Sequence, residues 1–450
     1  MTQPTLVFLH ALGASGREWD LVRAHLPDHR CIALDLAGFG ARADAGYADV
    51  ATMADSLADQ IRARELAACV LVGHSMGGKI VTLVAARAAS GEQGLAGILG
   101  VVLVAASPPA PEPIADDRRA RMIGWVATGP VARADAETFV DANCAARLPD
   151  PVRERAIADV ERSNREAWLG WLERGSREDW TARVGTVAIP ALILAGAEDG
   201  DLGEAAQRAL NLPHYPHGTV AAIDGAAHLI PYEQPEALAK AIAGHGAAVA
   251  SASLPTGFAR LLDSDRVGRR TRAAMLDRTR PVPREAAGWS DTQLHLVAAL
   301  VAQVLPDQGA DQGLALRVGV AVRGPGDGWR FADLPPDPIA WARGLATLDR
   351  LAGGFAALDH DAQRDWLMRI DAGEAGIADD PDHLSPAQMA LWFADLRAEI
   401  VRQWMATPAA MAAIGYDGFA VGGDGPRKQG YIRIAADDIE RWQHAAETTA

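Results

Sequence analysis

Short apolar runs recur along the first half of the chain, and amphipathic segments separate them. Runs of this kind, without polar alternation, are typical of strands that are buried on both faces of a parallel sheet. Because helical segments alternate with these strands, we predict a doubly wound, mostly parallel α/β sheet. The predicted strands are residues 5–9, 30–34, 69–72, 99–105, 190–195 and 220–223.

The alternation stops between about residue 110 and residue 185, where the pattern predicts helices only. This insertion contains four tryptophans, namely Trp125, Trp168, Trp171 and Trp180. A helical insertion rich in tryptophan predicts an apolar lid over a site, with Trp125 and Trp168 as candidate substrate-binding residues. The alternative is that these tryptophans only pack the lid on the sheet.

The α/β pattern ends near residue 245, and a stretch rich in Ala, Gly and Ser follows. This composition lacks periodicity and predicts a linker, which we place at residues 246–285. Residues 286–450 then show apolar stripes at helical spacing, so we predict a second, smaller all-α domain. Within it, capping patterns begin helices at Ser290 and Ser385, and the Gly- and Asp-rich residues 307–333 are predicted to form a loop.

Composition narrows the class of protein. The 450 residues are 49% hydrophobic and 22% charged, which is ordinary for globular domains. A net charge of −15 argues against nucleic-acid binding and against a polybasic membrane surface. Three cysteines, at spacings that suit neither metal nor haem, are expected to be reduced core residues.

The sequence also bears on location. It contains no apolar run of about 18 residues, so we expect no membrane span. A strand is predicted to begin at Thr5, which leaves no room for a signal peptide. We therefore expect a cytoplasmic protein, with export to the periplasm on a signal-bearing partner as the alternative.

The chemistry-bearing stretch is Gly73-His74-Ser75-Met76-Gly77, between a predicted buried strand and a predicted helix. Gly-x-Ser-x-Gly in this context is typical of a nucleophile elbow, a corner so tight that its flanking residues must lack a Cβ. The corner exposes the serine hydroxyl at the edge of the sheet, above the N-terminus of the helix. The pattern therefore predicts Ser75 as a nucleophile.

An acid and a histidine follow in the order that such a nucleophile needs. Asp199 comes after the strand at 190–195, and His228 comes after the strand at 220–223. The chain order Ser, Asp, His is the one found with nucleophile elbows. The alternatives for the acid are Glu198 and Asp201, and those for the histidine are His10, His74, His214 and His217.

Residues 1–245 resemble the α/β-hydrolase superfamily, in the compact form that starts at the third strand of the usual eight. The motifs that carry the resemblance are Phe8-Leu9-His10-Ala11-Leu12-Gly13, Asp35-Leu36-Ala37-Gly38-Phe39-Gly40, Gly73-His74-Ser75-Met76-Gly77-Gly78, Gly196-Ala197-Glu198-Asp199 and Ala227-His228. The sequence departs from the family pattern at Ala11, where glycine is usual, and this concerns the shape of the oxyanion loop.

The resemblance implies a serine hydrolase. His228 would accept the proton of Ser75, and Asp199 would hold the imidazole in the correct tautomer. The backbone N–H groups of Leu12 and Met76 would form the oxyanion hole. His10 and His74 would lie beside the site, shaping its loops or contacting substrate.

The second half resembles the small subunit of gluconate 2-dehydrogenase-type enzymes, the subunit 3 family, over roughly residues 290–430. The similar stretches are Phe355-Ala356-Ala357-Leu358-Asp359, Trp392-Phe393-Ala394-Asp395-Leu396-Arg397 and Gly415-Tyr416-Asp417-Gly418. The resemblance implies no cofactor in this chain, and a partner subunit of the glucose–methanol–choline type that carries FAD. The alternative is an unrelated helical bundle that dimerises the hydrolase.

Three functional hypotheses follow. The first is a serine hydrolase of an ester, lactone or diketone-type bond in a small molecule, which an associated dehydrogenase would supply as its product. The second is an accessory subunit that binds and stabilises such a dehydrogenase. The third stays within the fold, because the elbow also resembles C–C bond hydrolases and the lyase-like enzymes of menaquinone biosynthesis, and fold does not fix the reaction.

Overall fold

The computed structural model describes residues 3–250, 254–325, 331–419 and 424. They form two compact units. The first unit contains the residues up to Asp277 and the described residues after Tyr416, and the second contains Arg278–Tyr416. No helix in the described ranges is long and apolar enough to cross a membrane.

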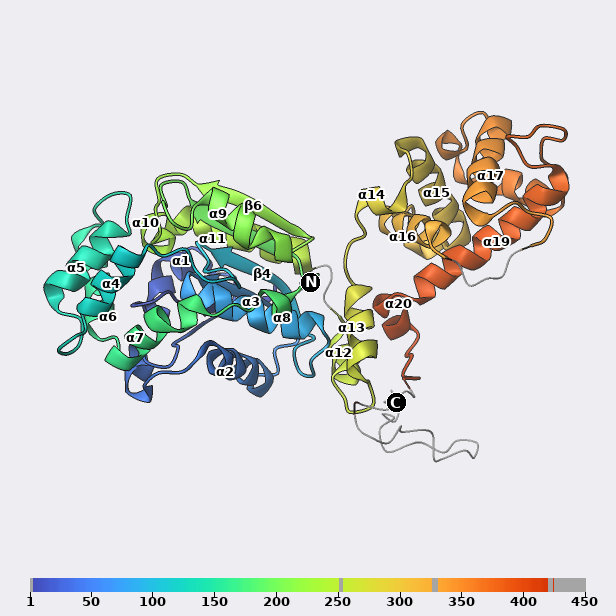
Figure 1. The fold of residues 1–450 in the computed structure, drawn as a ribbon. Helices are drawn as coiled ribbons and strands as arrows, with labels where there is room; N and C mark the ends of the chain where they lie inside the picture. The colour runs from blue at the N-terminus through green and yellow to red at the C-terminus, as the bar shows by residue number, and fades with distance from the viewer. Residues whose placement is uncertain (1–2, 251–253, 326–330, 420–423, 425–450) are drawn as a thin grey trace, which may run out of the picture. The chain divides into compact units, whose positions relative to one another are not determined.

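The first unit is built on one sheet, which helices surround (Figure 1). All paired strands are parallel, and their order is β2-β1-β3-β4-β5-β6. This confirms the predicted doubly wound α/β fold. The strands are β1 Thr5–Leu9, β2 Cys31–Leu34, β3 Cys69–His74, β4 Ile98–Val104, β5 Ala191–Gly196 and β6 Gly218–Ile223. In the register, Leu9 lies beside Gly73 and His74 beside Val104, so the carboxyl ends of the central strands meet at one edge.

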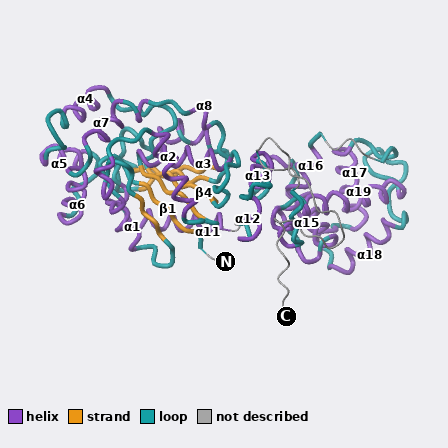
Figure 2. Tube along the Cα trace, turned by 90° about the horizontal axis from the view of Figure 1, so that it is seen from below, coloured by secondary structure: helices purple, strands orange, loops and turns teal. Residues whose placement is uncertain are grey.

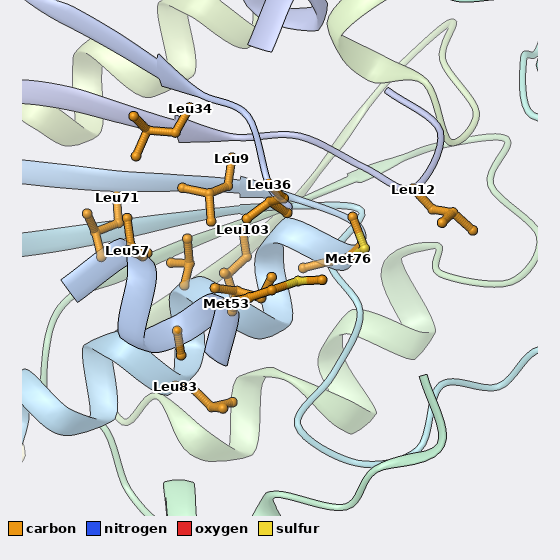
Figure 3. Packing of buried hydrophobic residues seen from close by; sticks show 14 of the residues in the cluster. Leu9, Leu12, Leu34, Leu36, Met53, Leu57, Leu71, Met76, Leu83 and Leu103 are labelled. Atoms are coloured by element: carbon orange, nitrogen blue, oxygen red, sulfur yellow. The ribbon is translucent and has the colours of Figure 1, made fainter. Parts of the chain in front are cut away.

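Helices cover both faces of this sheet (Figure 2). Helices α2 (Val50–Ala63) and α3 (Met76–Ala89) pack together on one face, and their apolar side chains join those of the strands in one core cluster. Figure 3 shows leucines of the strands packed against Met53 and Leu57 of α2. A separate core cluster contains other apolar side chains of the strands together with those of α1 (Asp20–Ala24) and α11 (Pro235–Ala250). Helix α9 (Glu204–Leu210) lies against β5 and β6.

The insertion between β4 and β5 is helical, as predicted, and we call residues 110–185 the lid. Its helices are α4 Asp116–Gly124, α5 Arg133–Ala142, α6 Asp150–Glu161, α7 Arg165–Glu173 and α8 Thr181–Val184. Trp168 is fully buried against Phe139, with ring centroids 5.2 Å apart, and Trp125 packs against both rings. These two tryptophans therefore form the core of the lid.

The structure differs from the prediction in the predicted linker. Helix α11 continues to Ala250, and α12 (Thr256–Leu262) and α13 (Arg269–Asp277) follow within the first unit. The alanine-rich stretch is helical because alanine has the highest helix propensity. Arg272 is buried, and it donates hydrogen bonds to the carbonyl groups of Leu262, Gly91 and Val267, which fixes α13 to the first unit.

The second unit is all-α, as predicted. Its helices are α14 Arg284–Ala287, α15 Asp291–Val304, α16 Gln312–Arg323, α17 Asp337–Ala352, α18 His360–Asp371, α19 Pro386–Met405 and α20 Pro408–Ala413. Both predicted helix caps are present, and Ser290 and Ser385 each form a capping box. Trp341 and Trp392 are fully buried in its core, in an edge-to-face pair.

One predicted loop of this unit is partly helical. Helix α16 lies within residues 307–333, because Leu314, Val318 and Val322 form a buried stripe that the nearby glycines obscure in the sequence. Residues 326–330 of that loop, and residues 420–423 and 425–450 of the predicted domain, lie outside the described part of the chain.

Candidate active site

Ser75 occupies a sharp corner between β3 and α3. Its backbone has φ 48° and ψ −117°, in the region that non-glycine residues rarely adopt. Close packing enforces the corner, since a Cβ on Gly73 would lie 2.6 Å from the carbonyl oxygen of Gly77. A Cβ on Gly77 would lie 2.7 Å from the carbonyl oxygen of Leu9. Glycine is therefore required on both sides of the serine.

Asp199 and His228 follow β5 and β6, and both line the same cavity as Ser75. Nδ1 of His228 lies 2.8 Å from Oδ2 of Asp199. The backbone N–H groups of Asp201 and Leu202 also donate to Oδ1 of Asp199, at 3.1 and 3.0 Å. The carboxylate is thus held by the turn that follows its own strand, and it fixes the orientation of the imidazole.

The alternative acids and histidines do not take the places of Asp199 and His228 beside Ser75. Asp201 lines the cavity but forms an ion pair with Arg118, and Glu198 is not part of the cavity wall. Nδ1 of His214 bonds to the carbonyl oxygen of Gly185 on the lid, outside the cavity. Among the described residues, His228 is the histidine that lines the cavity with Ser75.

The acid and the imidazole shift each other's pKa. Burial alone would raise the pKa of Asp199, but the hydrogen bonds from His228 and from the backbone outweigh it and lower this pKa to about 2. Burial alone would lower the pKa of His228, but the hydrogen bond to Asp199 and its charge outweigh burial and raise this pKa above 6.5. Asp199 is therefore ionised at neutral pH and stabilises the imidazolium form of His228.

The loop after β1 brings backbone donors to the cavity. Ala11 and Leu12 line it, and Gly13 turns the loop with φ 76°. In the described ranges, the N–H of Leu12 has no hydrogen-bond partner. Met76 is the first residue of α3, where a backbone N–H has no partner within its own helix. Both groups are suitably placed in the chain for an oxyanion hole.

His10 holds this loop from within the protein. It is fully buried, its Nε2 accepts the N–H of Leu36 at 3.0 Å, and its Nδ1 donates to the carbonyl oxygen of Ala11 at 2.7 Å. Burial lowers its pKa, so the ring is neutral. His10 does not line the cavity, and the structure gives it a loop-shaping position instead of a substrate contact.

A buried chain of hydrogen bonds joins the oxyanion loop to the loop of His228, and we call it the Glu18–His74 bridge. The N–H of Ala11 donates to Oε2 of Glu18 at 3.1 Å, and Oε1 of Glu18 bonds to Nδ1 of His74. Nε2 of His74 lies 2.8 Å from the carbonyl oxygen of His228 and must donate, because a carbonyl oxygen only accepts. Both side chains are fully buried. No sequence pattern indicates this role of Glu18, since its partner His74 lies 56 residues away.

The cavity is small, about 50 Å³, and its wall comes largely from the lid. Apolar side chains dominate this wall, namely Ile114, Met122, Phe139, Trp171, Leu172, Leu202 and Leu229. Trp171 lines the cavity, whereas the predicted substrate-binding residues Trp125, Trp168, His10 and His74 do not. The indole N–H of Trp168 donates to the carbonyl oxygen of Met122 inside the lid. A sequence pattern does not show which tryptophan of a helical insertion points inward.

The polar part of the cavity wall contains Glu112, Arg118, Asn143 and Asp201. Arg118 pairs with Asp201 and donates to Oδ1 of Asn143 at 2.8 Å. Burial raises the pKa of Glu112, although the hydroxyl of Ser107 donates to it at 2.6 Å. Within the described ranges, no three His, Cys, Asp or Glu side chains are grouped to hold a metal ion.

Comparison with known proteins identifies the family to which this architecture belongs. Residues 6–241 match the model of the alpha/beta hydrolase family. A relative from Citrobacter koseri, named 2-succinyl-6-hydroxy-2,4-cyclohexadiene-1-carboxylate synthase, is 28% identical over 202 residues, which are 44% of this chain and 78% of that protein. A Klebsiella pneumoniae protein, provisionally named carbamate hydrolase RutD, is 30% identical over 204 residues, which are 44% of this chain and 74% of that protein.

Among solved structures, a thermophilic esterase from Thermogutta terrifontis is 25% identical, with a TM-score of 0.47, over 55% of this chain and 91% of that one. The family match covers the sheet, the lid and the elbow described above, and it extends over more than half of the sequence. The chain belongs to the alpha/beta hydrolase family.

Proposed function

We propose that the chain is a serine hydrolase of carboxylic ester-type bonds, with Ser75 as nucleophile, His228 as base and Asp199 as the acid that orients the base. One observation carries the proposal. The imidazole of His228 is hydrogen-bonded to Asp199 at 2.8 Å, in a cavity that the strained residue Ser75 also lines. Strained backbone of this kind is concentrated at active sites.

The residues support a two-step reaction. His228 takes the proton of the Ser75 hydroxyl as the oxygen attacks the substrate carbonyl, and Asp199 stabilises the imidazolium that forms. The backbone N–H groups of Leu12 and Met76 stabilise the oxyanion. The imidazolium then protonates the leaving group, and a water molecule, deprotonated by His228, hydrolyses the acyl-enzyme. An ester, a lactone or a diketone can each supply the carbonyl group.

The test is a fluorophosphonate probe together with hydrolysis of p-nitrophenyl acetate, a small ester chosen because the cavity is small. We expect the wild type to be labelled and active, and Ser75→Ala to lose both properties. Ser56→Ala, a serine on α2 with a hydrogen bond to Arg42, is the matched control and should behave as wild type. Labelling that survives Ser75→Ala would contradict the proposal.

A second candidate is C–C bond cleavage or elimination by the same three residues. The Citrobacter koseri relative favours it, because that protein is named as a synthase of a cyclohexadiene carboxylate. The two candidates differ in their substrates and not in their residues. Turnover of an aryl 1,3-diketone to a carboxylic acid and a ketone, without turnover of any ester, would favour this second candidate.

For the helical unit we propose, from the sequence resemblance alone, a docking role toward a flavin-dependent dehydrogenase whose product the hydrolase then opens. In that case the accessory role and the hydrolase role belong to one chain. Co-purification of a flavoprotein from the native source would support this part of the proposal. A chain that binds no flavoprotein would contradict it and leave the hydrolase proposal intact. The cytoplasmic location also stays a prediction.

A further inference from the structure

Glu112 is a polar residue of the cavity wall that the proposed reaction does not use. It lies where the chain leaves β4 for the lid, and it lines the cavity together with Ser75 and His228. Two contacts fix it in place. Its backbone N–H donates to the carbonyl oxygen of Ser176 at 2.7 Å, and its Oε2 accepts the hydroxyl of Ser107 at 2.6 Å.

The other carboxylate oxygen of Glu112 is available to a ligand. In the described part of the chain, Oε1 of Glu112 has no hydrogen-bond donor. This acceptor lines a small and mostly apolar cavity, so a substrate that fills the cavity displaces water from Oε1 and gains affinity by placing a donor there.

Among the described residues, the Lys or Arg side chain that lines the cavity is Arg118, and it is already paired. Arg118 uses its guanidinium for Asp201 and for Asn143, and the amide nitrogen of Asn143 donates to the carbonyl oxygen of Phe139. Lys79 does not line the cavity, since its ammonium donates to lid carbonyl oxygens of Gly175 and Glu178, at 3.2 and 3.0 Å. A substrate carboxylate would therefore meet an acceptor without meeting an unpaired cation.

We propose that Glu112 determines substrate class: the site takes substrates whose tail presents an O–H or N–H donor, and it rejects those whose tail ends in a carboxylate. This inference rests on the proposed hydrolase function. The selection follows from geometry, because a donor completes the hydrogen bonding of Glu112. A carboxylate at the same place leaves two acceptors facing each other in a site of low dielectric.

The experiment compares matched p-nitrophenyl esters of a short acid whose tail ends in methyl, hydroxymethyl or carboxylate. A second series carries the same three ends on the alcohol side, because the tail can lie on either side of the scissile bond. The readout is kcat/KM for each ester. For the wild type we expect the order hydroxymethyl, methyl, carboxylate in at least one series, with about tenfold or more between first and last.

Two substitutions of Glu112 separate its effects. Glu112→Gln keeps an acceptor and adds an N–H donor, so the disadvantage of the carboxylate ester should shrink about fivefold or more, while hydroxymethyl keeps its advantage over methyl. Glu112→Leu removes the acceptor, so the advantage of hydroxymethyl should disappear. Asp116→Asn removes the same charge from an exposed position of the lid and should keep the wild-type order.

The outcomes separate this inference from the function on which it rests. If the wild type hydrolyses these esters, if Ser75→Ala does not, and if both Glu112 variants keep the wild-type ratios, then the inference is wrong and the hydrolase function stands. If no ester is hydrolysed faster by the wild type than by Ser75→Ala, the proposed hydrolase function itself fails. Melting temperatures of all variants exclude loss of the fold as the cause of lost activity.

Discussion

The two units bury polar groups for different purposes. In the first unit, the buried residues Glu18 and His74 connect two loops at the cavity. In the second unit, the buried residues Thr347 and Gln363 hydrogen-bond to backbone groups of its own turns and helices. Tryptophan and aliphatic side chains fill the rest of that core.

This difference indicates where chemistry and where stability reside. Burying an ionisable side chain costs free energy unless the side chain is paired. Because such costly groups are concentrated at functional sites, a network of them around one cavity indicates a catalytic role. A core of apolar side chains closed by a few neutral polar groups points to packing. Substitutions should therefore separate activity from stability in the first unit and affect stability alone in the second.

The largest expected effect is that of Asp199→Asn, at about 10⁴-fold in kcat/KM, because the amide would stabilise the wrong tautomer of His228 and no longer its charged form. In the wild type, activity requires neutral His228 and should rise with pH through the raised pKa, above 6.5. Without Asp199 this pKa falls, so the acidic limb should move to lower pH. The pH profile of kcat/KM measures both effects.

The control for that variant is Asp201→Asn, which removes the neighbouring acid and its ion pair with Arg118. It should leave the acidic limb in place, because Asp201 does not bond to His228. If Asp199→Asn leaves the acidic limb of the pH profile unchanged and lowers kcat/KM less than tenfold, then the buried polar groups of the first unit do not serve the proposed reaction.

The next effect belongs to the second unit. Trp392→Ala should lower the free energy of unfolding of that unit by about 3–5 kcal/mol, since it empties the centre of the core beside Trp341. Urea unfolding measures the loss. Because the site lies in the first unit, kcat should not change in the absence of denaturant. If Trp392→Ala lowers kcat as well as the free energy of unfolding, then the second unit affects activity and the comparison between the units is wrong.

A smaller effect is expected at the Glu18–His74 bridge. Glu18→Ala leaves the N–H of Ala11 and Nδ1 of His74 without their partner, and displacement of the loops should lower kcat by about 10–100-fold with little change in KM. Glu18→Gln can accept from Ala11 and donate to His74, so most of kcat should return. Steady-state kinetics of both variants test this prediction. A purely structural role would predict a lower melting temperature with unchanged kcat.

The smallest effect is expected at the start of α19. Ser385→Ala removes the side chain that accepts the N–H of Gln388 in the capping box and should cost about 1 kcal/mol. Hydrogen exchange at the first turn of α19 should increase, while kcat stays at the wild-type value. Ser385→Thr is the conservative control and should retain the cap and the protection.

Local patterns explain what the sequence could predict. The strands, the elbow and the helix caps at Ser290 and Ser385 depend on neighbours in the chain, so the apolar runs and the local spacing were sufficient to predict them. The convergence of Ser75, Asp199 and His228 on one cavity follows from the parallel sheet, because the carboxyl ends of its strands meet at one edge.

Contacts between distant segments explain what the sequence could not predict. Glu18 and His74 are paired across the sheet edge, and Glu112 faces the cavity only because the lid folds over it. The wall of the cavity likewise depends on how the lid helices pack, which placed Trp171 on the wall and Trp168 in the lid core. Helix α11 extends over residues 246–250 of the predicted linker, so the alanine content there indicated helix more strongly than the lack of periodicity indicated flexibility.

The backbone of Ser75 has a consequence for the history of this chain. A serine at φ 48° carries a conformational cost of about 1–3 kcal/mol, which glycine at the same position would largely avoid. Selection for stability alone would thus favour glycine at the elbow, in a protein whose whole margin is typically about 5–15 kcal/mol. A chain that served only to hold a partner would have no reason to keep the less stable residue. A serine at this strained position is therefore what we expect if Ser75 is the proposed nucleophile.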